Sequence, residues 1–293
     1  MDFIFTLSDQ QLPYHNIPAH PDLRLDIKRL DLIHPLISGN KFYKLKDNIR
    51  TAQQQGYQQL LTFGGAYSNH IAATAAAGKL LNIPTIGIIR GEELEHQALN
   101  PTLTTAQQNG MQLHFVSRQE YRQRHEAEYL ARLSAKFPYA YIIPEGGTNT
   151  LAVQGCQEIL SEKDLQTYDV ICCAVGTGGT ISGLINASAE HQQVIGFPAL
   201  KGDFLIQDIQ HWTKKSNWLL VQDYHFGGYA KVTPALLDFI QRFEQQYQIP
   251  LEPIYTGKML FGLFELIKQN YFVKGSRILV IHSGGLQGKT SLS

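Results

Sequence analysis

The chain of 293 residues is long enough for one large domain or two smaller ones. Hydrophobic residues make up 43% and charged residues 17%, and the 25 lysines and arginines balance the 25 aspartates and glutamates. This composition is typical of a globular protein. Without a basic excess, the sequence predicts neither a nucleic-acid partner nor binding to an anionic membrane.

The cysteines and the N-terminus indicate where such a protein works. Cys172 and Cys173 are neighbours in an apolar run, and with Cys156 we expect them to be buried thiols in a reducing compartment. The first residues lack the basic region and apolar core of a signal peptide. No apolar run approaches the roughly 18 residues of a membrane span. We therefore expect a cytoplasmic protein.

In chain order, the first predicted element is a strand at residues 23–28, where apolar and polar residues alternate and give one polar face. A turn at residues 38–40 then precedes a predicted helix at 41–55. Further strands are predicted at the apolar runs 60–63, 85–89, 113–116, 140–143, 170–175, 194–197, 218–221 and 278–281, with helices between most of them, as at 68–81, 121–136 and 180–187. This alternation predicts parallel sheets covered by helices on both faces.

Four glycine clusters directly follow apolar runs. They are Gly64-Gly65, Gly146-Gly147, the loop at residues 176–180, and Gly284-Gly285. Glycine allows a ligand to approach the backbone closely, and ligands of open α/β sheets bind at the carboxyl ends of strands. The four clusters together therefore predict one shared crevice, although any one pair is also typical of a simple tight turn.

The loop Gly176-Thr177-Gly178-Gly179-Thr180 lies between a predicted strand and a predicted helix. Backbone N–H groups and hydroxyls at a helix N-terminus bind phosphate. The loop is not a Walker motif, because no Lys-Ser or Lys-Thr follows, and it does not fit the dinucleotide pattern G-x-G-x-x-G. The alternative is a plain tight turn.

Lys41 and Lys44 are three residues apart at the start of the predicted helix and share a face. The positive end of a helix lowers the pKa of a nearby lysine, and a neutral amine is what forms a Schiff base. Two lysines at this position are also typical of solvated surface charges.

Ser68 precedes a predicted helix, so its hydroxyl is expected to cap that helix or to face a ligand together with Asn69 and His70. Tyr229 and Tyr255 are candidate proton donors or acceptors. Most of the 14 tyrosines must be structural.

Taken together, these segments resemble the family of 1-aminocyclopropane-1-carboxylate deaminases and D-cysteine desulfhydrases, which are pyridoxal-phosphate enzymes of fold type II, like the β subunit of tryptophan synthase. The similarity lies in six segments in register, at residues 38–45, 68–70, 144–149, 176–180, 255–258 and 282–285. It implies two three-layer α/β/α domains with mostly parallel sheets and a cofactor cleft between them. Residues 1–46 and 156–293 would form the large domain, and 47–155 the small one.

The resemblance also implies roles for single residues. Lys41 would form the Schiff base with pyridoxal 5'-phosphate, and Asn69 would contact the 3-oxygen of the cofactor ring. Ser68 would lie by the substrate carboxylate or act in proton transfer. The phosphate would be held by Lys44, Gly176, Thr177, Gly178, Gly179 and Thr180. Tyr229 and Tyr255 would flank the substrate, and Ser283 or Thr256 would lie near the pyridine nitrogen. No metal is expected.

The reaction implied is β-elimination from D-cysteine, with formation of pyruvate, ammonia and sulfide in a homodimer. Deaminases of this family resemble one another in a Tyr-Glu-Gly-Lys motif, whose glutamate approaches the pyridine nitrogen, whereas this chain has Thr256 there. The segment Ser68-Asn69-His70 is also more similar to the desulfhydrases. Tyr67, where both branches usually have glutamine, and the short C-terminus are departures. The alternatives are 1-aminocyclopropane-1-carboxylate deaminase activity and a non-catalytic ligand-binding module on the same scaffold.

Overall fold

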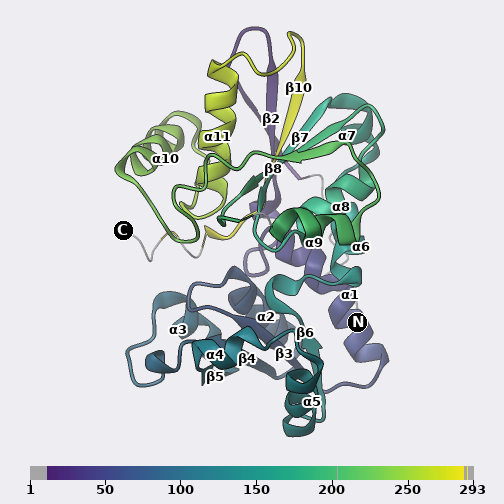
Figure 1. Ribbon diagram of the computed structural model, residues 1–293, viewed down its shortest axis with the longest axis vertical. Helices are drawn as coiled ribbons and strands as arrows, with labels where there is room; N and C mark the ends of the chain where they lie inside the picture. Colours follow the sequence, from purple (N-terminus) through teal and green to yellow (C-terminus); the bar gives the residue numbers. More distant parts are fainter. Residues whose placement is uncertain (1–11, 203, 287–288, 290–293) are drawn as a thin grey trace.

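The computed structural model describes residues 12–202, 204–286 and 289, and within them two sheets form the centres of two lobes (Figure 1). The six-stranded sheet has the order β1-β2-β10-β7-β8-β9, and the four-stranded sheet has the order β5-β4-β3-β6. Every strand pair is parallel except β1–β2. The strands are β1 (Tyr14–Ile17), β2 (Arg24–Arg29), β3 (Gln59–Gly64), β4 (Thr85–Arg90), β5 (Met111–Val116), β6 (Ala140–Ile143), β7 (Val170–Val175), β8 (Gln193–Pro198), β9 (Trp218–Leu220) and β10 (Arg277–His282).

Helices separate most of the strands, as the alternation in the sequence predicts. The helices are α1 (Asn40–Gln54), α2 (Asn69–Leu81), α3 (Pro101–Gln108), α4 (Arg118–Arg122), α5 (Ala127–Lys136), α6 (Thr150–Gln157), α7 (Glu162–Thr167), α8 (Gly179–Ala187), α9 (Phe204–Trp212), α10 (Pro234–Tyr247) and α11 (Thr256–Lys268), with short 3-10 turns η2 (Leu30–Leu32), η3 (Glu92–Leu94) and η4 (Glu145–Gly147). Among the described residues, no helix is long and apolar enough to cross a membrane.

The sequence pattern is wrong about one helix and misses one strand. The helix expected at residues 121–136 is interrupted after α4, where the Arg124 guanidinium donates a hydrogen bond to the Tyr121 carbonyl at 3.2 Å and the Arg124 amide donates to the same carbonyl at 3.3 Å. That carbonyl would accept a hydrogen bond from residue 125 in a continuous helix. The missed strand is β1, a four-residue antiparallel edge strand that is too short to show a clear period.

On the polar face predicted for β2, Asp26 and Lys28 are buried and paired, whereas Arg24 at the start of the strand is exposed. The Lys28 ammonium donates to the Asp164 carboxylate at 2.6 Å, and the Tyr168 hydroxyl donates to Asp26 at 2.9 Å. Because unpaired charges are costly inside a protein, these contacts are what allow a strand with this sequence to pack against the interior.

Both faces of the six-stranded sheet are covered by hydrophobic residues. Along β7, Ile171 and Cys173 pack into one core cluster, and Cys172 packs into the other, which includes Leu260 and Leu263 of α11. Alternation between two apolar cores explains why the sequence of this strand is continuously apolar. The three cysteines are free and buried, as expected.

Helix α1 lies between the two lobes in Figure 1. The carboxyl ends of β3, β4 and β6 from one sheet and of β7 and β10 from the other lead into residues that line a common space. The three-layer fold class is therefore as predicted. The division at residues 46/47 and 155/156 stays a prediction, and parts of the predicted large domain, residues 1–11 and 290–293, lie outside the described residues.

Candidate active site

A cavity of about 1000 Å³ is lined by residues that follow strands of both sheets. Each of the four glycine clusters contributes to its wall, through Gly65, Gly146, Gly176 with Gly178, and Gly284. This agrees with the single crevice that the clusters predict. Predicted site residues that also line it are Lys41, Lys44, Ser68, Asn69, Thr177, Thr180, Tyr229, Tyr255 and Ser283.

The start of α1 is fixed by the loop that follows β10. The Asn40 amide donates a hydrogen bond to the Ser283 carbonyl at 3.1 Å. Gly39, with φ of 69°, lies so close to this loop that a Cβ atom would be 1.8 Å from the Ser283 carbonyl oxygen. No other residue type fits at position 39 without moving one of the two segments, so their contact determines where Lys41 lies.

Lys41 is linked to the glycine-rich loop through its neighbour. Its Nζ donates to Asn40 Oδ1 at 3.0 Å, and Asn40 Nδ2 donates to Thr180 Oγ1 at 2.8 Å. Burial, and secondly the charge of Lys44, lower the pKa of Lys41 to about 7. Burial lowers the pKa of Lys44 to about 8. The low pKa expected for Lys41 is therefore caused by burial and by Lys44, and not by the positive end of the helix as predicted.

Lys44 and the glycine-rich loop form a cradle for an anion. The Lys44 Nζ donates to the Gly146 carbonyl at 2.9 Å and to Thr148 Oγ1 at 3.0 Å, and it lies 3.4 Å from Thr177 Oγ1. The loop continues into the N-terminus of α8, and a Cβ atom on Gly179 would be 3.2 Å from the Lys44 Nζ. An ammonium group, two hydroxyls and a helix N-terminus are suitable partners for a phosphate group.

On the opposite wall, Ser68 both caps α2 and lines the cavity. Its Oγ accepts a hydrogen bond from the Ile71 amide at 3.3 Å, so Ser68 is the cap of α2, and its role toward a ligand stays a prediction. The next side chain, Asn69, has a buried Oδ1 without a hydrogen-bond partner among the described residues. An unsatisfied buried amide beside the cavity fits the ring-binding role that the resemblance gives to Asn69.

His70 is neutral and presents a lone pair. The Thr62 hydroxyl donates to the Ile143 carbonyl at 2.9 Å, so its oxygen, 2.8 Å from His70 Nε2, accepts the proton of that nitrogen. His70 Nδ1 is then an acceptor, and it is buried without a partner in the part of the chain that the structure describes. Burial, with the charges of Lys41 and Lys44, lowers the pKa of His70.

Tyr229 and Tyr255 meet at the wall formed by the larger lobe, which contains the six-stranded sheet; the smaller lobe contains the four-stranded sheet. Their ring centroids are 6.2 Å apart at an interplanar angle of 63°. Burial raises the pKa of both phenols, while their mutual hydrogen bond lowers that of Tyr229 and raises that of Tyr255. The loop that carries Tyr229 is held by Lys258, whose Nζ donates to the carbonyls of His225 at 2.9 Å and Gly228 at 2.8 Å.

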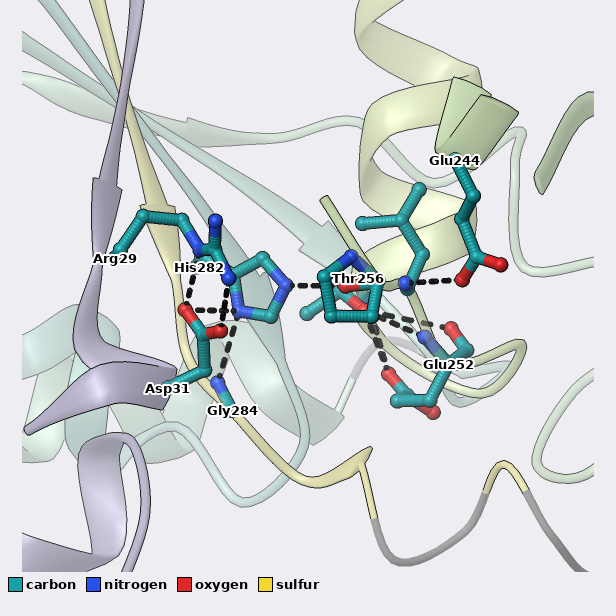
Figure 2. A network of polar contacts seen from close by, with 9 residues as sticks. Arg29, Asp31, Glu244, Glu252, Thr256, His282 and Gly284 are labelled. Carbon is teal, nitrogen blue, oxygen red and sulfur yellow. Dashed lines mark hydrogen bonds and ion pairs between the residues drawn. The ribbon is translucent and has the colours of Figure 1, made fainter. Parts of the chain in front are cut away.

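Thr256, in contrast, does not line the cavity. It is fully buried, and Figure 2 shows it bonded to Glu252, whose carboxylate accepts the Thr256 amide at 2.6 Å and lies 3.2 Å from its hydroxyl. In the same view, the His282 ring lies between Asp31 and the segment before Glu252, with Nε2 2.8 Å from the Pro250 carbonyl. Of the two candidates for the pyridine nitrogen, only Ser283 reaches the cavity wall.

Some cavity residues were not predicted. Asn40 and Thr148 lie inside segments that carry the resemblance, and their neighbours in those segments were the only signal for them. Arg90, Arg124 and Asp208 also line the cavity, but a charged residue after a strand or within a helix is indistinguishable from a surface charge in the sequence.

Comparison with known proteins agrees with the geometry. A family model described as "Pyridoxal-phosphate dependent enzyme" matches residues 10–284. The mitochondrial bifunctional D-cysteine desulfhydrase/1-aminocyclopropane-1-carboxylate deaminase of Arabidopsis thaliana is 30% identical, over 97% of this chain and 78% of that protein.

Solved structures extend the likeness to the fold. The crystal structure of a homologue of 1-aminocyclopropane-1-carboxylate deaminase matches with a TM-score of 0.83 and 26% identity, over 98% of this chain and 95% of that chain. A hydrogen sulfide-producing enzyme from Fusobacterium nucleatum has a TM-score of 0.69 at 16% identity, over 97% and 98% of the two chains, and shows the fold alone. With a lysine of lowered pKa beside a phosphate cradle, the chain belongs to the pyridoxal-phosphate dependent enzymes, in the family of 1-aminocyclopropane-1-carboxylate deaminases and D-cysteine desulfhydrases.

Proposed function

We propose that this enzyme is a carbon–sulfur lyase that converts D-cysteine, or a related β-substituted amino acid, into pyruvate, ammonia and sulfide. The observation that carries the proposal is the meeting of Lys41, Lys44, Ser68 and the tyrosine pair around one cavity. The lowered pKa of Lys41, about 7, leaves its amine available as a nucleophile and as a base near neutral pH.

The residues of the chain divide the work between binding and proton transfer. Lys44 and the loop at residues 176–180 hold the phosphate, Asn69 faces the ring, and Ser68 lies beside the substrate carboxylate. Pyridoxal phosphate, once bound, supplies the electron sink for the α-carbon. Lys41 Nζ then takes the α-proton, and Tyr229 with Tyr255 flank the β-substituent.

The electron balance of this elimination requires no oxidant. The C–H electrons at the α-carbon form the new double bond, and the C–S bonding pair leaves with sulfur, which is protonated. The released aminoacrylate takes up water and yields pyruvate and ammonia.

The group available to the pyridine nitrogen favours elimination over cyclopropane opening, because Ser283, the candidate that lines the cavity, is a hydroxyl and not a carboxylate. Opening the three-membered ring is the more demanding cleavage, and a hydroxyl does not keep the pyridine nitrogen protonated as a carboxylate does. Glu252, the carboxylate near Thr256, is engaged by the amides of Ile254, Tyr255 and Thr256 at 2.6–2.7 Å. It is absent from the cavity wall. The second candidate function is 1-aminocyclopropane-1-carboxylate deamination, because the name of the Arabidopsis relative includes this activity.

Product analysis of the purified holoenzyme tests the proposal. Pyruvate and sulfide in equal amounts from D-cysteine support it, and 2-oxobutanoate from 1-aminocyclopropane-1-carboxylate supports the second function instead. Bound cofactor with no α-proton exchange into deuterated water, across a broad panel of amino acids, would indicate a non-catalytic binding module.

The proposal includes a homodimer, a cytoplasmic location and the domain division at residues 46/47 and 155/156. Light scattering after size exclusion tests the first of these, because a dimer has twice the 32.9 kDa mass of one chain.

A further inference from the structure

Arg90 is a cation on the cavity wall at the end of β4, next to the strand that leads to Ser68. Ile89 pairs with Gly64 across β4 and β3, so Arg90 lies beside Gly65 at the start of the Ser68 turn. A Cβ atom on Gly65 would be 3.4 Å from Arg90 Nη2. The guanidinium is therefore close to the backbone that carries Ser68.

Within residues 12–202, 204–286 and 289, Arg90 forms no ion pair. Glu93, whose pKa is lowered first by its hydrogen bond from Arg118 and to a lesser degree by the charge of Arg90, is paired with Arg118 at 2.6 Å. The carboxylate on that side of the cavity, Glu145, is already engaged: one oxygen accepts the Tyr121 hydroxyl at 2.7 Å and the other accepts Arg124 Nε at 2.6 Å. Arg90 instead lies over the Tyr121 ring, with its guanidinium carbon 5.9 Å from the centroid. On this side of the cavity wall, Arg90 and Arg124 thus outnumber the one carboxylate, Glu145, by one positive charge; the other acid of the wall, Asp208, belongs to α9 of the other lobe.

This charge faces the place proposed for the substrate. From the smaller lobe, Arg90 is near enough to Tyr229 of the larger lobe to lower the pKa of that phenol, against the dominant effect of burial. Arg90 therefore lies near the turn that carries Ser68 and near Tyr229, two of the groups that the proposed function assigns to the substrate.

We propose that Arg90 is a specificity-determining residue that binds an acidic group on the β-substituent of the substrate, so that the preferred substrates are amino acids with a second anionic group. The inference rests on the proposed β-elimination. A planar guanidinium with free donors is suited to bidentate binding of a carboxylate. The α-carboxylate is left to the Ser68 turn.

Two substrates that differ only in charge test this inference. S-carboxymethyl-D-cysteine carries the second carboxylate, and S-carbamoylmethyl-D-cysteine is its neutral isostere; elimination from both yields pyruvate and a thiol. We expect the wild-type holoenzyme to prefer the acid at least about tenfold in kcat/KM, and Arg90→Gln to bring this ratio near one. Arg132→Gln removes an exposed arginine of the same lobe, outside the cavity wall, and should leave the ratio unchanged.

Binding provides a readout that does not depend on turnover. Titration of the holoenzyme with each compound, followed by the cofactor absorbance, should give a lower dissociation constant for the acid, and this advantage should disappear in Arg90→Gln. Equal affinities in the wild type, a preference that survives Arg90→Gln, or an equal loss for both compounds would overturn the inference. The proposed function fails on a different result, namely absence of pyruvate from D-cysteine, whatever the charge preference in binding.

Discussion

Glu252 turns back on its own chain and accepts the backbone amide of Thr256 at 2.6 Å. The same carboxylate accepts the amides of Tyr255 and Ile254, both at 2.7 Å. It thereby caps α11, whose N-cap residue Tyr255 makes no side-chain cap of its own. Since Tyr255 extends from this helix start into the cavity wall, a buried carboxylate outside the site determines the position of a residue inside it.

Glu252→Gln should therefore destabilise the protein. The amide has one acceptor oxygen in place of two, and its NH2 group is a buried donor facing other donors. Leaving buried polar groups without hydrogen bonds costs about 1–3 kcal/mol, so the free energy of unfolding measured in urea should fall by that amount. Asp238→Asn, at an exposed ion pair of α10, is the control and should change stability by no more than about 0.5 kcal/mol. Equal effects of the two changes would contradict the capping role.

Lys41→Ala should abolish the Schiff-base absorbance of the cofactor and leave the far-ultraviolet circular dichroism unchanged. Lys44→Ala should keep the absorbance but weaken cofactor binding about tenfold to a hundredfold, because it removes a charged partner of the phosphate. Lys46 is paired with Glu158 and does not line the cavity, so Lys46→Ala is the matched control with normal absorbance. Absorbance that persists in Lys41→Ala would refute the assignment.

The pH dependence of apoprotein stability should reflect the buried amines with a lowered pKa, Lys41 and Lys44 among them. The pKa is lowered from 10.5 to about 7 for Lys41 and to about 8 for Lys44, so between these values and 10.5 the unfolded chain binds more protons than the folded one. Stability against urea should then rise with pH from about 7 to about 9. In Lys41→Met the rise should be smaller, whereas Lys274→Met, at an exposed site, should keep the wild-type slope. An unchanged slope in Lys41→Met would show that its pKa is not depressed.

The sequence predicts the sheets better than the site walls, for physical reasons. Buried parallel strands such as β7 need continuous apolar runs, and glycine is required where Gly39 meets Ser283, so both features are visible in one chain. Thr256 was expected near the cofactor, but its place depends on Glu252, a contact that no local pattern encodes. Arg90 was missed because its significance depends on Glu145 being engaged elsewhere.

The loop that carries Tyr229 depends on Lys258 in a way that a double-mutant cycle measures. The Lys258 side chain is buried and donates to two carbonyls of this loop, those of His225 and Gly228. Without these hydrogen bonds the loop loses its anchor and Tyr229 its position, and small misplacements of a reacting group cost up to about a hundredfold in rate. Lys258→Met should therefore lower kcat strongly, while Lys268→Met, at an exposed ion pair on the same helix, should not. If Lys258 acts through Tyr229, replacing Lys258 in the Tyr229→Phe variant should lower kcat little further. Fully additive losses of kcat would show that Lys258 does not act through Tyr229.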